Sequence, residues 1–154
     1  MELQLHFELG GRIAGILAVF FRMAPAEDAS NESIGRLIDQ SEAYREDPTA
    51  EEGAFTGTIR LEDIVNTTSP FFAYAGSLTI PPCTEGVIWI LQKDVQNVSV
   101  DQYNRWYNFV SYPGNRRPVQ PLNGRRINFF GQNRFSDDLD NVFGLASPAP
   151  IRGQ

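Results

Sequence analysis

The fold of this 154-residue chain is decided by one stretch, Tyr74-Ala-Gly-Ser-Leu-Thr-Ile-Pro-Pro-Cys-Thr-Glu-Gly-Val-Ile-Trp89. Its glycine, serine and paired prolines are typical of a loop, because these residues suit backbone angles that regular elements do not use. The apolar run Val87 to Leu91 that overlaps its end predicts a buried strand. We therefore expect a loop that leads into a strand of a sheet.

Two further strands are predicted at the start of the chain. Residues 1–8 alternate, with Leu3 and Leu5 on one face and Gln4 and His6 on the other, which is the period of a half-buried strand. Gly10-Gly11 predicts a turn, and the apolar run Ile13 to Phe21 follows it. We expect these segments to form neighbouring antiparallel strands.

Two short helices are predicted on the surface. Asn31 can cap the first helix, and Ser99 with Gln102 forms a capping box for the second. The first helix carries an apolar stripe of Ile34, Leu37 and Ile38. The second is expected to bury Tyr103, Trp106, Tyr107 and Val110. Residues 44–58 are predicted to be a loop.

The chain divides into one domain, residues 1–130, and a tail, residues 131–154. The domain is expected to end with an irregular arginine-rich loop, Asn115 to Arg125, and a last strand, Ile127 to Phe130. The tail is acidic and contains prolines, which is typical of a segment outside a core.

Charge and hydropathy exclude several functions. The net charge is −6, so a nucleic-acid partner is not expected, because phosphate binding needs a basic surface. The longest apolar run, Ile13 to Phe21, is about half of what a transmembrane helix needs. The start of the chain is charged at once and lacks a basic leader, so we expect any targeting sequence to lie outside it.

Few residues in this chain could support catalysis or bind a metal. His6 and Cys83 are the strong candidate metal ligands, and no His-x-His or Cys-x-x-Cys spacing is present. A nucleophile elbow and a glycine-rich phosphate loop are also absent from the sequence. A self-contained zinc site is therefore not expected.

The deciding stretch resembles the active-site signature of the α-type carbonic anhydrases, through Gly76-Ser-Leu-Thr79, Pro81-Pro82, Glu85 and Trp89. Glu2-Leu-Gln-Leu resembles the family strand Glu-Leu-His-Leu. Gly15 to Phe21 resembles the next strand, and Asn115 to Arg125 resembles the family element Asn-x-Arg-Pro-x-Gln-x-x-Asn-x-Arg. The resemblance implies a mainly β fold, a large, twisted and mostly antiparallel sheet with short surface helices.

The resemblance also assigns roles to residues. Thr79 matches the gatekeeper threonine, whose hydroxyl orients the zinc-bound hydroxide that attacks carbon dioxide in the family. Carbonic anhydrase is itself a standard example of a zinc ion that lowers the pKa of its bound water. The apolar wall of the substrate pocket corresponds to Ile16, Leu78, Ile80 and Trp89. Ile80 also resembles the residue found here in acatalytic carbonic-anhydrase-related proteins.

The departures from the family concern its zinc ligands. The resemblance begins partway through the family domain, so we expect a sheet that lacks its N-terminal side, including two histidine ligands. Gln4 takes the position of the third ligand, and an amide is a poor zinc ligand. Glu2 is then the outer-shell partner of that position. In the alternative alignment, shifted by two residues, His6 becomes the third ligand.

Cys83 and three sequons bear on the compartment. In extracellular and lumenal family members a cysteine at the position of Cys83 forms a disulfide with the N-terminal region. Asn31, Asn66 and Asn97 each begin an Asn-x-Ser/Thr sequence. The resemblance thus implies a secreted protein or one in an organelle lumen.

Two functions are compatible with this sequence. The first is a non-catalytic carbonic-anhydrase-like domain that serves as a structural or binding subunit without a cofactor, with a protein partner that covers the N-terminal edge of the sheet. The alternative is a genuine zinc carbonic anhydrase, which hydrates carbon dioxide and whose metal-binding part lies on another chain or outside this sequence.

Overall fold

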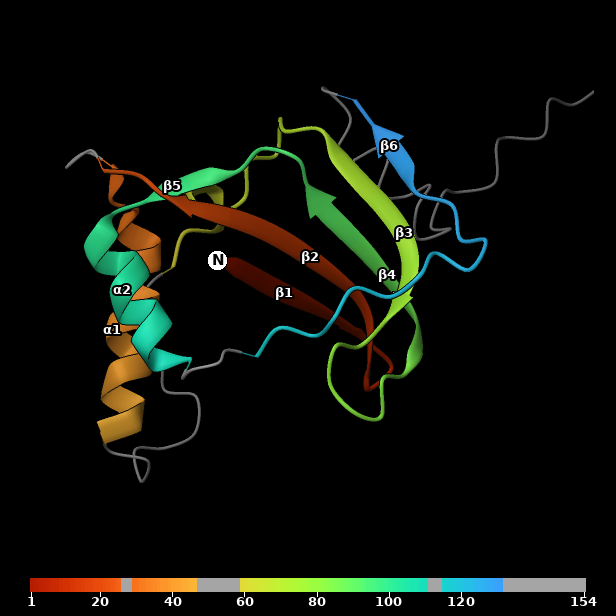
Figure 1. The fold of residues 1–154 in the computed structure, drawn as a ribbon, viewed down its shortest axis with the longest axis horizontal. Coiled ribbons are helices and arrows are strands. Elements are labelled where there is room, and N and C mark those ends of the chain that lie inside the picture. The colour runs from red at the N-terminus through yellow and green to blue at the C-terminus, as the bar shows by residue number, and fades with distance from the viewer. Residues whose placement is uncertain (26–28, 47–58, 111–114, 132–154) are drawn as a thin grey trace, which may run out of the picture.

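The computed structural model describes residues 1–25, 29–46, 59–110 and 115–131 (Figure 1). Two helices lie beside one end of a sheet, next to the short strand β5. The described elements are β1 (Glu2–Leu9), β2 (Arg12–Met23), α1 (Glu32–Glu46), the 3-10 helix η2 (Leu61–Asp63), β3 (Phe71–Ser77), β4 (Glu85–Gln92), β5 (Gln96–Val98), α2 (Val100–Phe109) and β6 (Asn128–Phe130).

The strands form an open, mixed sheet in the order β1-β2-β4-β3-β6, with β5 paired to β2 off this path. The pairs β1–β2, β3–β4 and β3–β6 are antiparallel, whereas β2 pairs in parallel with both β4 and β5. The predicted mainly β fold with short surface helices is confirmed. β2 has the most strand partners, because it pairs with β1, β4 and β5.

The predicted hairpin at the start of the chain is confirmed. β1 and β2 pair antiparallel, with Gln4 opposite Ala18. Gly10 and Gly11 join them with φ angles of 59° and 75°. A two-residue hairpin turn of this hand needs positive φ at both central positions, which glycine adopts without a steric penalty.

The prediction of a loop from Tyr74 onward is wrong for its first part. Tyr74 to Ser77 belongs to β3, which lies between β4 and β6 and buries Phe71 and Ala73. Stacking of Phe71 on Phe130, with ring centroids 4.8 Å apart, helps to hold β6 against it. Gly76 is explained by its close contact with another strand rather than by a loop, and the loop itself is confined to Leu78–Thr84.

Each face of the sheet carries its own apolar cluster. The larger cluster lies on the face that α1 and α2 cover, where Leu17, Val19 and Phe21 of β2 meet Ile34 and Ile38 of α1. The opposite face holds the smaller cluster, which is described with the candidate site. Alternation along β2 explains both clusters, because successive side chains of a strand point to opposite faces.

The helices differ from the prediction in length and burial. α1 continues to Glu46, so residues 44–46 are not loop, and residues 47–58 lie outside the described part. The capping box of α2 is confirmed, since Ser99 Oγ accepts from Gln102 N. Tyr107 was expected to be buried but is 47% exposed. It stacks on Tyr103 at the outer surface, and Gln102 occupies the interior instead.

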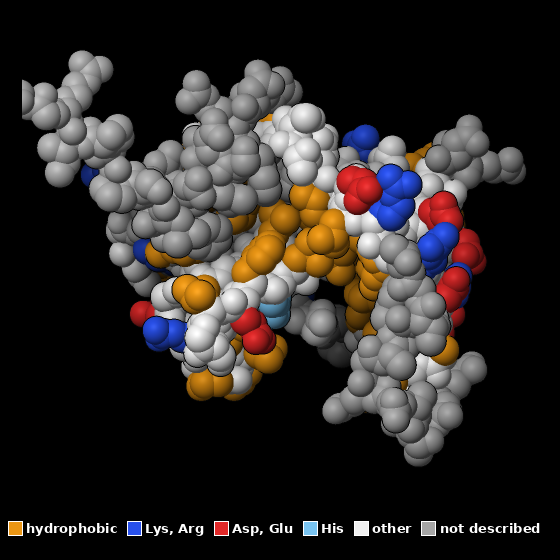
Figure 2. All heavy atoms as spheres, turned by 180° about the vertical axis from the view of Figure 1, so that it is seen from behind, with side chains coloured by type: hydrophobic (Ala, Val, Ile, Leu, Met, Phe, Trp, Pro, Cys, Tyr) orange, Lys and Arg blue, Asp and Glu red, His pale blue; other side chains and the backbone are white. Residues whose placement is uncertain are grey.

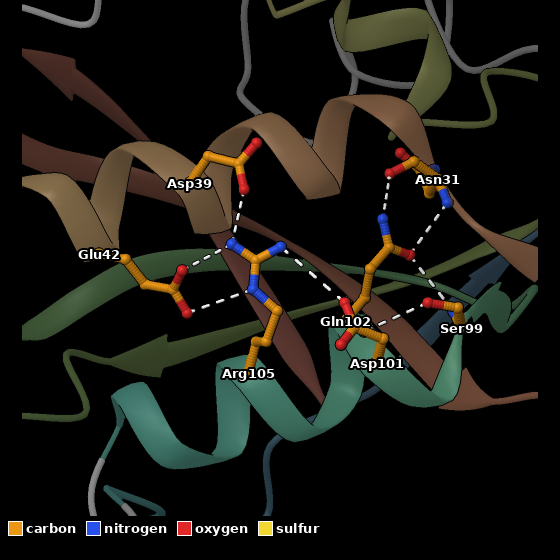
Figure 3. Close-up of polar contacts among 7 residues, drawn as sticks. All are labelled: Asn31, Asp39, Glu42, Ser99, Asp101, Gln102 and Arg105. Carbon is orange, nitrogen blue, oxygen red and sulfur yellow. Dashed lines mark hydrogen bonds and ion pairs between the residues drawn. The ribbon is translucent and has the colours of Figure 1, made fainter.

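Gln102 joins the two helices through its buried amide (Figure 3). Its Oε1 accepts from the backbone N–H groups of Asn31 (3.1 Å) and Ser99 (3.3 Å), and its Nε2 donates to the carbonyl oxygen of Asn31 (2.7 Å). All of these contacts lie where both helices begin. One side chain therefore forms hydrogen bonds with backbone groups at the starts of both helices.

Arg105 forms a second connection between the helices (Figure 3). Its Nη2 atom lies 2.6 Å from both Asp39 Oδ1 and Glu42 Oε2 of α1. The hydrogen bond from Arg105 and its positive charge hold the pKa of Glu42 below its ordinary value of 4.5.

No helix in the described ranges is long and apolar enough to cross a membrane. The tail predicted for residues 131–154 lies outside the described residues, apart from Gly131.

Candidate functional site

The candidate site begins with a polar row on β1. Glu2, Gln4 and His6 lie opposite Phe20, Ala18 and Ile16 of β2, respectively. Residues directly opposite in an antiparallel pair share a face of the sheet. The row therefore lies on the face opposite the helices, beside the smaller apolar cluster.

Hydrogen bonds connect the members of this row. Gln4 Nε2 donates to Glu2 Oε1 at 2.8 Å, and Gln4 Oε1 lies 3.3 Å from His6 Nε2. That nitrogen donates when it carries the imidazole proton. Gln4 is half-buried, whereas Glu2 and His6 are exposed. Both ends of the Gln4 amide are thus engaged by neighbours on its own strand.

An apolar wall lies next to the polar row. Its buried members are Ile16, Ala18, Val87 and Trp89, and Leu78 and Tyr74 are among the side chains that pack against them. Ile16 pairs with Trp89 across the parallel strands β2 and β4. The structure thus brings together three of the predicted wall residues, Ile16, Leu78 and Trp89.

Ile80 lies apart from this wall. Its side chain is 67% exposed and is not a member of the apolar cluster. Ile80 lies at the tip of the Leu78–Thr84 loop, where its backbone carbonyl accepts from Cys83 N at 2.8 Å. Ile80 therefore contributes its backbone carbonyl to the loop, and its side chain is not part of the wall.

The loop itself positions Thr79 and Cys83. Leu78 N donates to Thr84 O at 3.0 Å and closes the base of the loop, and the Pro81–Pro82 peptide bond is cis. Thr79 is half-buried and directly follows the wall residue Leu78. Cys83 has a free, half-buried thiol and a φ of 57°.

Trp89 anchors the loop to the sheet. Its indole Nε1 donates to Ser77 O at 2.9 Å, and its ring stacks on Tyr74 with centroids 6.3 Å apart. Trp89 therefore both forms part of the wall and holds the residue that precedes the loop.

Two arginines that the sequence placed only in an irregular segment also hold this region. Arg117 Nη1 donates to Ser77 Oγ and to Leu78 O, each at 3.1 Å. Arg125 Nη1 donates to Ala75 O at 3.1 Å. The sequence assigned these arginines no partners, because their targets lie 39 to 50 positions away along the chain.

Arg125 also lies over an aromatic ring of the apolar wall. Its guanidinium carbon is 5.8 Å from the centroid of the Tyr74 ring, within the range of a cation–π contact. Burial raises the pKa of the Tyr74 phenol above its ordinary value, and the positive charge of Arg125 acts in the opposite direction. The phenol therefore stays neutral at physiological pH.

A groove opens at the end of the wall, between the hairpin turn and the start of β4. Its lining includes Leu78 and Val87 of the wall, and Glu8, Arg12 and Glu85 at its polar margin. Figure 2 shows that hydrophobic side chains also gather in a broad band on one face of the molecule.

The described residues do not fit a zinc ion. They contain no group of three or more His, Cys, Asp or Glu side chains that could hold a metal. The candidate face offers one imidazole, one carboxylate and the amide of Gln4, whereas zinc prefers thiolate, imidazole and carboxylate ligands in a tetrahedral set.

Known proteins match this chain in sequence. The family model for eukaryotic-type carbonic anhydrases matches residues 11–130. Alpha carbonic anhydrase 4 of Arabidopsis thaliana is 32% identical over 136 residues, which cover 86% of this chain and 47% of that protein. Alpha carbonic anhydrase 3 of the same plant is 34% identical over 130 residues, which cover 82% and 44%, respectively.

Solved structures match as well. The α-carbonic anhydrase of Thermovibrio ammonificans, in complex with sulfanilamide, has a TM-score of 0.64 at 30% identity. The match covers 82% of this chain and 52% of that protein. Dioscorin complexed with ascorbate has a TM-score of 0.66 at 25% identity, with coverages of 86% and 54%. The chain thus spans about half the length of the relatives it matches.

Proposed function

Because this chain belongs to the eukaryotic-type carbonic anhydrase family, we propose that it is a non-catalytic member that serves as a binding subunit of a protein assembly. These matches confirm the family that the resemblance around Thr79 predicted. The observation that supports the proposal is the state of Gln4: its amide, which the family resemblance assigns to the third ligand position, is engaged at both ends by Glu2 and His6.

The chemistry of the amide supports this proposal. A zinc ligand in this family is a neutral imidazole, and an amide oxygen is a weak substitute for it. Gln4 would have to release His6 before its oxygen could turn to a metal, since that oxygen lies 3.3 Å from the imidazole. Glu2 accepts the hydrogen bond of the Gln4 amide, as an outer-shell carboxylate accepts from a ligand. We propose that this part of the family architecture is retained without a metal.

The partner that we propose is a protein segment that adds a strand to the sheet. In the described part of the chain, β1 pairs with β2 alone, so its other edge offers unpaired N–H and C=O groups. Phe7 and Leu9 on this strand are 48% and 71% exposed, respectively. An extended segment along β1 would satisfy the backbone and cover these side chains.

We also propose that the protein is secreted or resides in an organelle lumen. Cys83 is available for a disulfide with a partner segment, since it is free, only partly buried and flanked by exposed loop residues. An oxidising compartment would allow such a bond.

The alternative function is carbon dioxide hydration in a zinc site completed by another chain or by a further part of the same protein. Thr79 favours it, because it follows the wall residue Leu78 as a gatekeeper should. In that case His6 would be the ligand from this chain, and it would have to exchange its contact with Gln4 for the metal.

Zinc content and hydration rate of the native protein, purified with its partners, distinguish the two functions. We expect zinc well below one ion per chain and a hydration rate at the background level. The carbonic anhydrase of Thermovibrio ammonificans serves as the positive control. Stoichiometric zinc together with hydration that a sulfonamide inhibits would overturn the non-catalytic proposal and establish the alternative.

A further inference from the structure

The sequon at Asn66 differs from the other two in its surroundings. Asn66, Thr67 and Thr68 lie between η2 and β3, and all three residues are exposed. The backbone of Asn66 is held by Gln92, whose Oε1 accepts from Asn66 N at 3.0 Å. The turn is therefore anchored through its backbone while its side chains face solvent.

The side chain of Asn66 is held through its amide oxygen. Asn66 Oδ1 accepts from Thr68 N at 3.0 Å and from Thr68 Oγ1 at 2.7 Å. Among the described residues, Asn66 Nδ2 has no hydrogen-bond partner. Donors to an amide oxygen stabilise the negative charge that develops there when the nitrogen loses a proton. The hydroxyl of the sequon is thus already in contact with the amide that would react.

Asn31 has the opposite arrangement. Its Nδ2 donates to Asp63 O at 2.8 Å, and its Oδ1 accepts from Ile34 N at 3.0 Å as the cap of α1. The hydroxyl residue of this sequon, Ser33, is 3% exposed and donates to Asp63 Oδ2. Modification at Asn31 would disturb a cap that stabilises the helix.

Asn97 is exposed but lies in a fixed segment. Its Oδ1 accepts from Arg22 Nε at 2.9 Å, and β5 pairs with β2. The middle residue of this sequon, Val98, is fully buried, and Ser99 Oγ is engaged as the cap of α2. This tripeptide cannot enter an enzyme site without opening the core.

We propose that Asn66 is the acceptor of an N-linked oligosaccharide and that Asn31 and Asn97 are not. The donor is an oligosaccharide on a lipid pyrophosphate, which a membrane glycosyltransferase of the secretory pathway supplies. A bond forms between Asn66 Nδ2 and the anomeric carbon of the sugar, and the bond from that carbon to the pyrophosphate oxygen breaks. The amide proton leaves with the lipid pyrophosphate, and no oxidation or reduction occurs.

The test is site occupancy in the full chain secreted from yeast behind a cleavable signal peptide. Peptide-N-glycosidase F in ¹⁸O water converts each glycosylated asparagine to labelled aspartate, which mass spectrometry then locates. We expect most copies to carry the label at Asn66 and few at Asn31 or Asn97. An unlabelled Asn66, or labelling of Asn31 or Asn97 at the level of Asn66, would overturn the proposal.

Matched variants connect occupancy to the sequon hydroxyl. Thr68→Ala should abolish labelling at Asn66, and Thr67→Ala, next to it in the same turn, should leave it unchanged. Thr68→Ser keeps a hydroxyl and should retain labelling. Equal labelling of Thr68→Ala and the parent chain would contradict the proposal. This result is independent of metal content, so it can fail while the proposed function holds.

Discussion

Gly76 lies so close to the indole of Trp89 that a Cβ atom at this position would stand 2.6 Å from Trp89 Cδ1 and 3.0 Å from Nε1. The indole cannot move away freely, because it is buried and its Nε1 donates to Ser77 O. The packing of the wall therefore requires glycine at position 76, because glycine has no Cβ atom.

Gly76→Ala should lower the free energy of unfolding by about 1–3 kcal/mol, the usual cost of overpacking. The measurement is urea-induced unfolding followed by tryptophan fluorescence. Gly131→Ala is the control, since an added Cβ there meets no described residue within 4 Å. Equal stability of the two variants would show that Trp89 relaxes without cost.

Gln102→Leu should destabilise the packing of α1 against α2. Leucine fills the space but leaves the N–H groups of Asn31 and Ser99 and the carbonyl of Asn31 without this partner. We expect a loss of about 2–4 kcal/mol, because unsatisfied buried polar groups are costly. Thermal unfolding followed by circular dichroism measures this loss, and Asn104→Leu at an exposed position of α2 is the control.

The pH dependence of stability should reflect the contact between Glu42 and Arg105. The pKa of Glu42 is lowered in the folded state, so its stabilising contribution is present above its ordinary value of 4.5 and is lost as the pH falls through the folded value. Arg105→Met should return the pKa of Glu42 toward 4.5 in an NMR titration. Arg126→Met should leave it unchanged, and a Glu42 pKa that does not respond to Arg105→Met would refute the assignment.

Arg117→Met should loosen the loop that carries Thr79. The substitution removes the donors to Ser77 Oγ and Leu78 O and retains most of the aliphatic stem. We expect faster hydrogen exchange over residues 78–84 and a loss of about 1–2 kcal/mol in stability. Arg116→Met, at the exposed neighbouring position, is the control. Unchanged exchange in Arg117→Met would mean that Arg117 does not hold the loop.

Local patterns in the sequence predicted the elements whose signals are local. The hairpin followed from Gly10-Gly11 and the alternation of residues 1–8, and the start of α2 followed from Ser99 and Gln102. In each case the residues that determine the structure lie within a few positions of each other. Such contacts need no knowledge of the rest of the chain.

The missed features depend on contacts between distant segments. Tyr74 to Ser77 was predicted as loop because Gly76 suggests one, and its true cause is the indole of Trp89 on the neighbouring strand. Gln102 was predicted as part of a cap, but its contact with Asn31 spans two helices. Neither partner can be identified from spacing in one sequence.

The position of β2 in the sheet has a consequence for the order in which the chain is made. β2 ends at Met23, and its parallel neighbour β4 begins at Glu85, so the hairpin leaves the ribosome well before one side of β2 has a partner. Residues Ile16 to Val19 are buried in the finished fold and remain exposed to solvent during this interval. Contacts this distant in sequence slow folding and favour aggregation. The nascent chain should therefore expose this apolar surface until β4, which ends at Gln92, has left the ribosome, and slower translation of residues 24–84 should lower its yield.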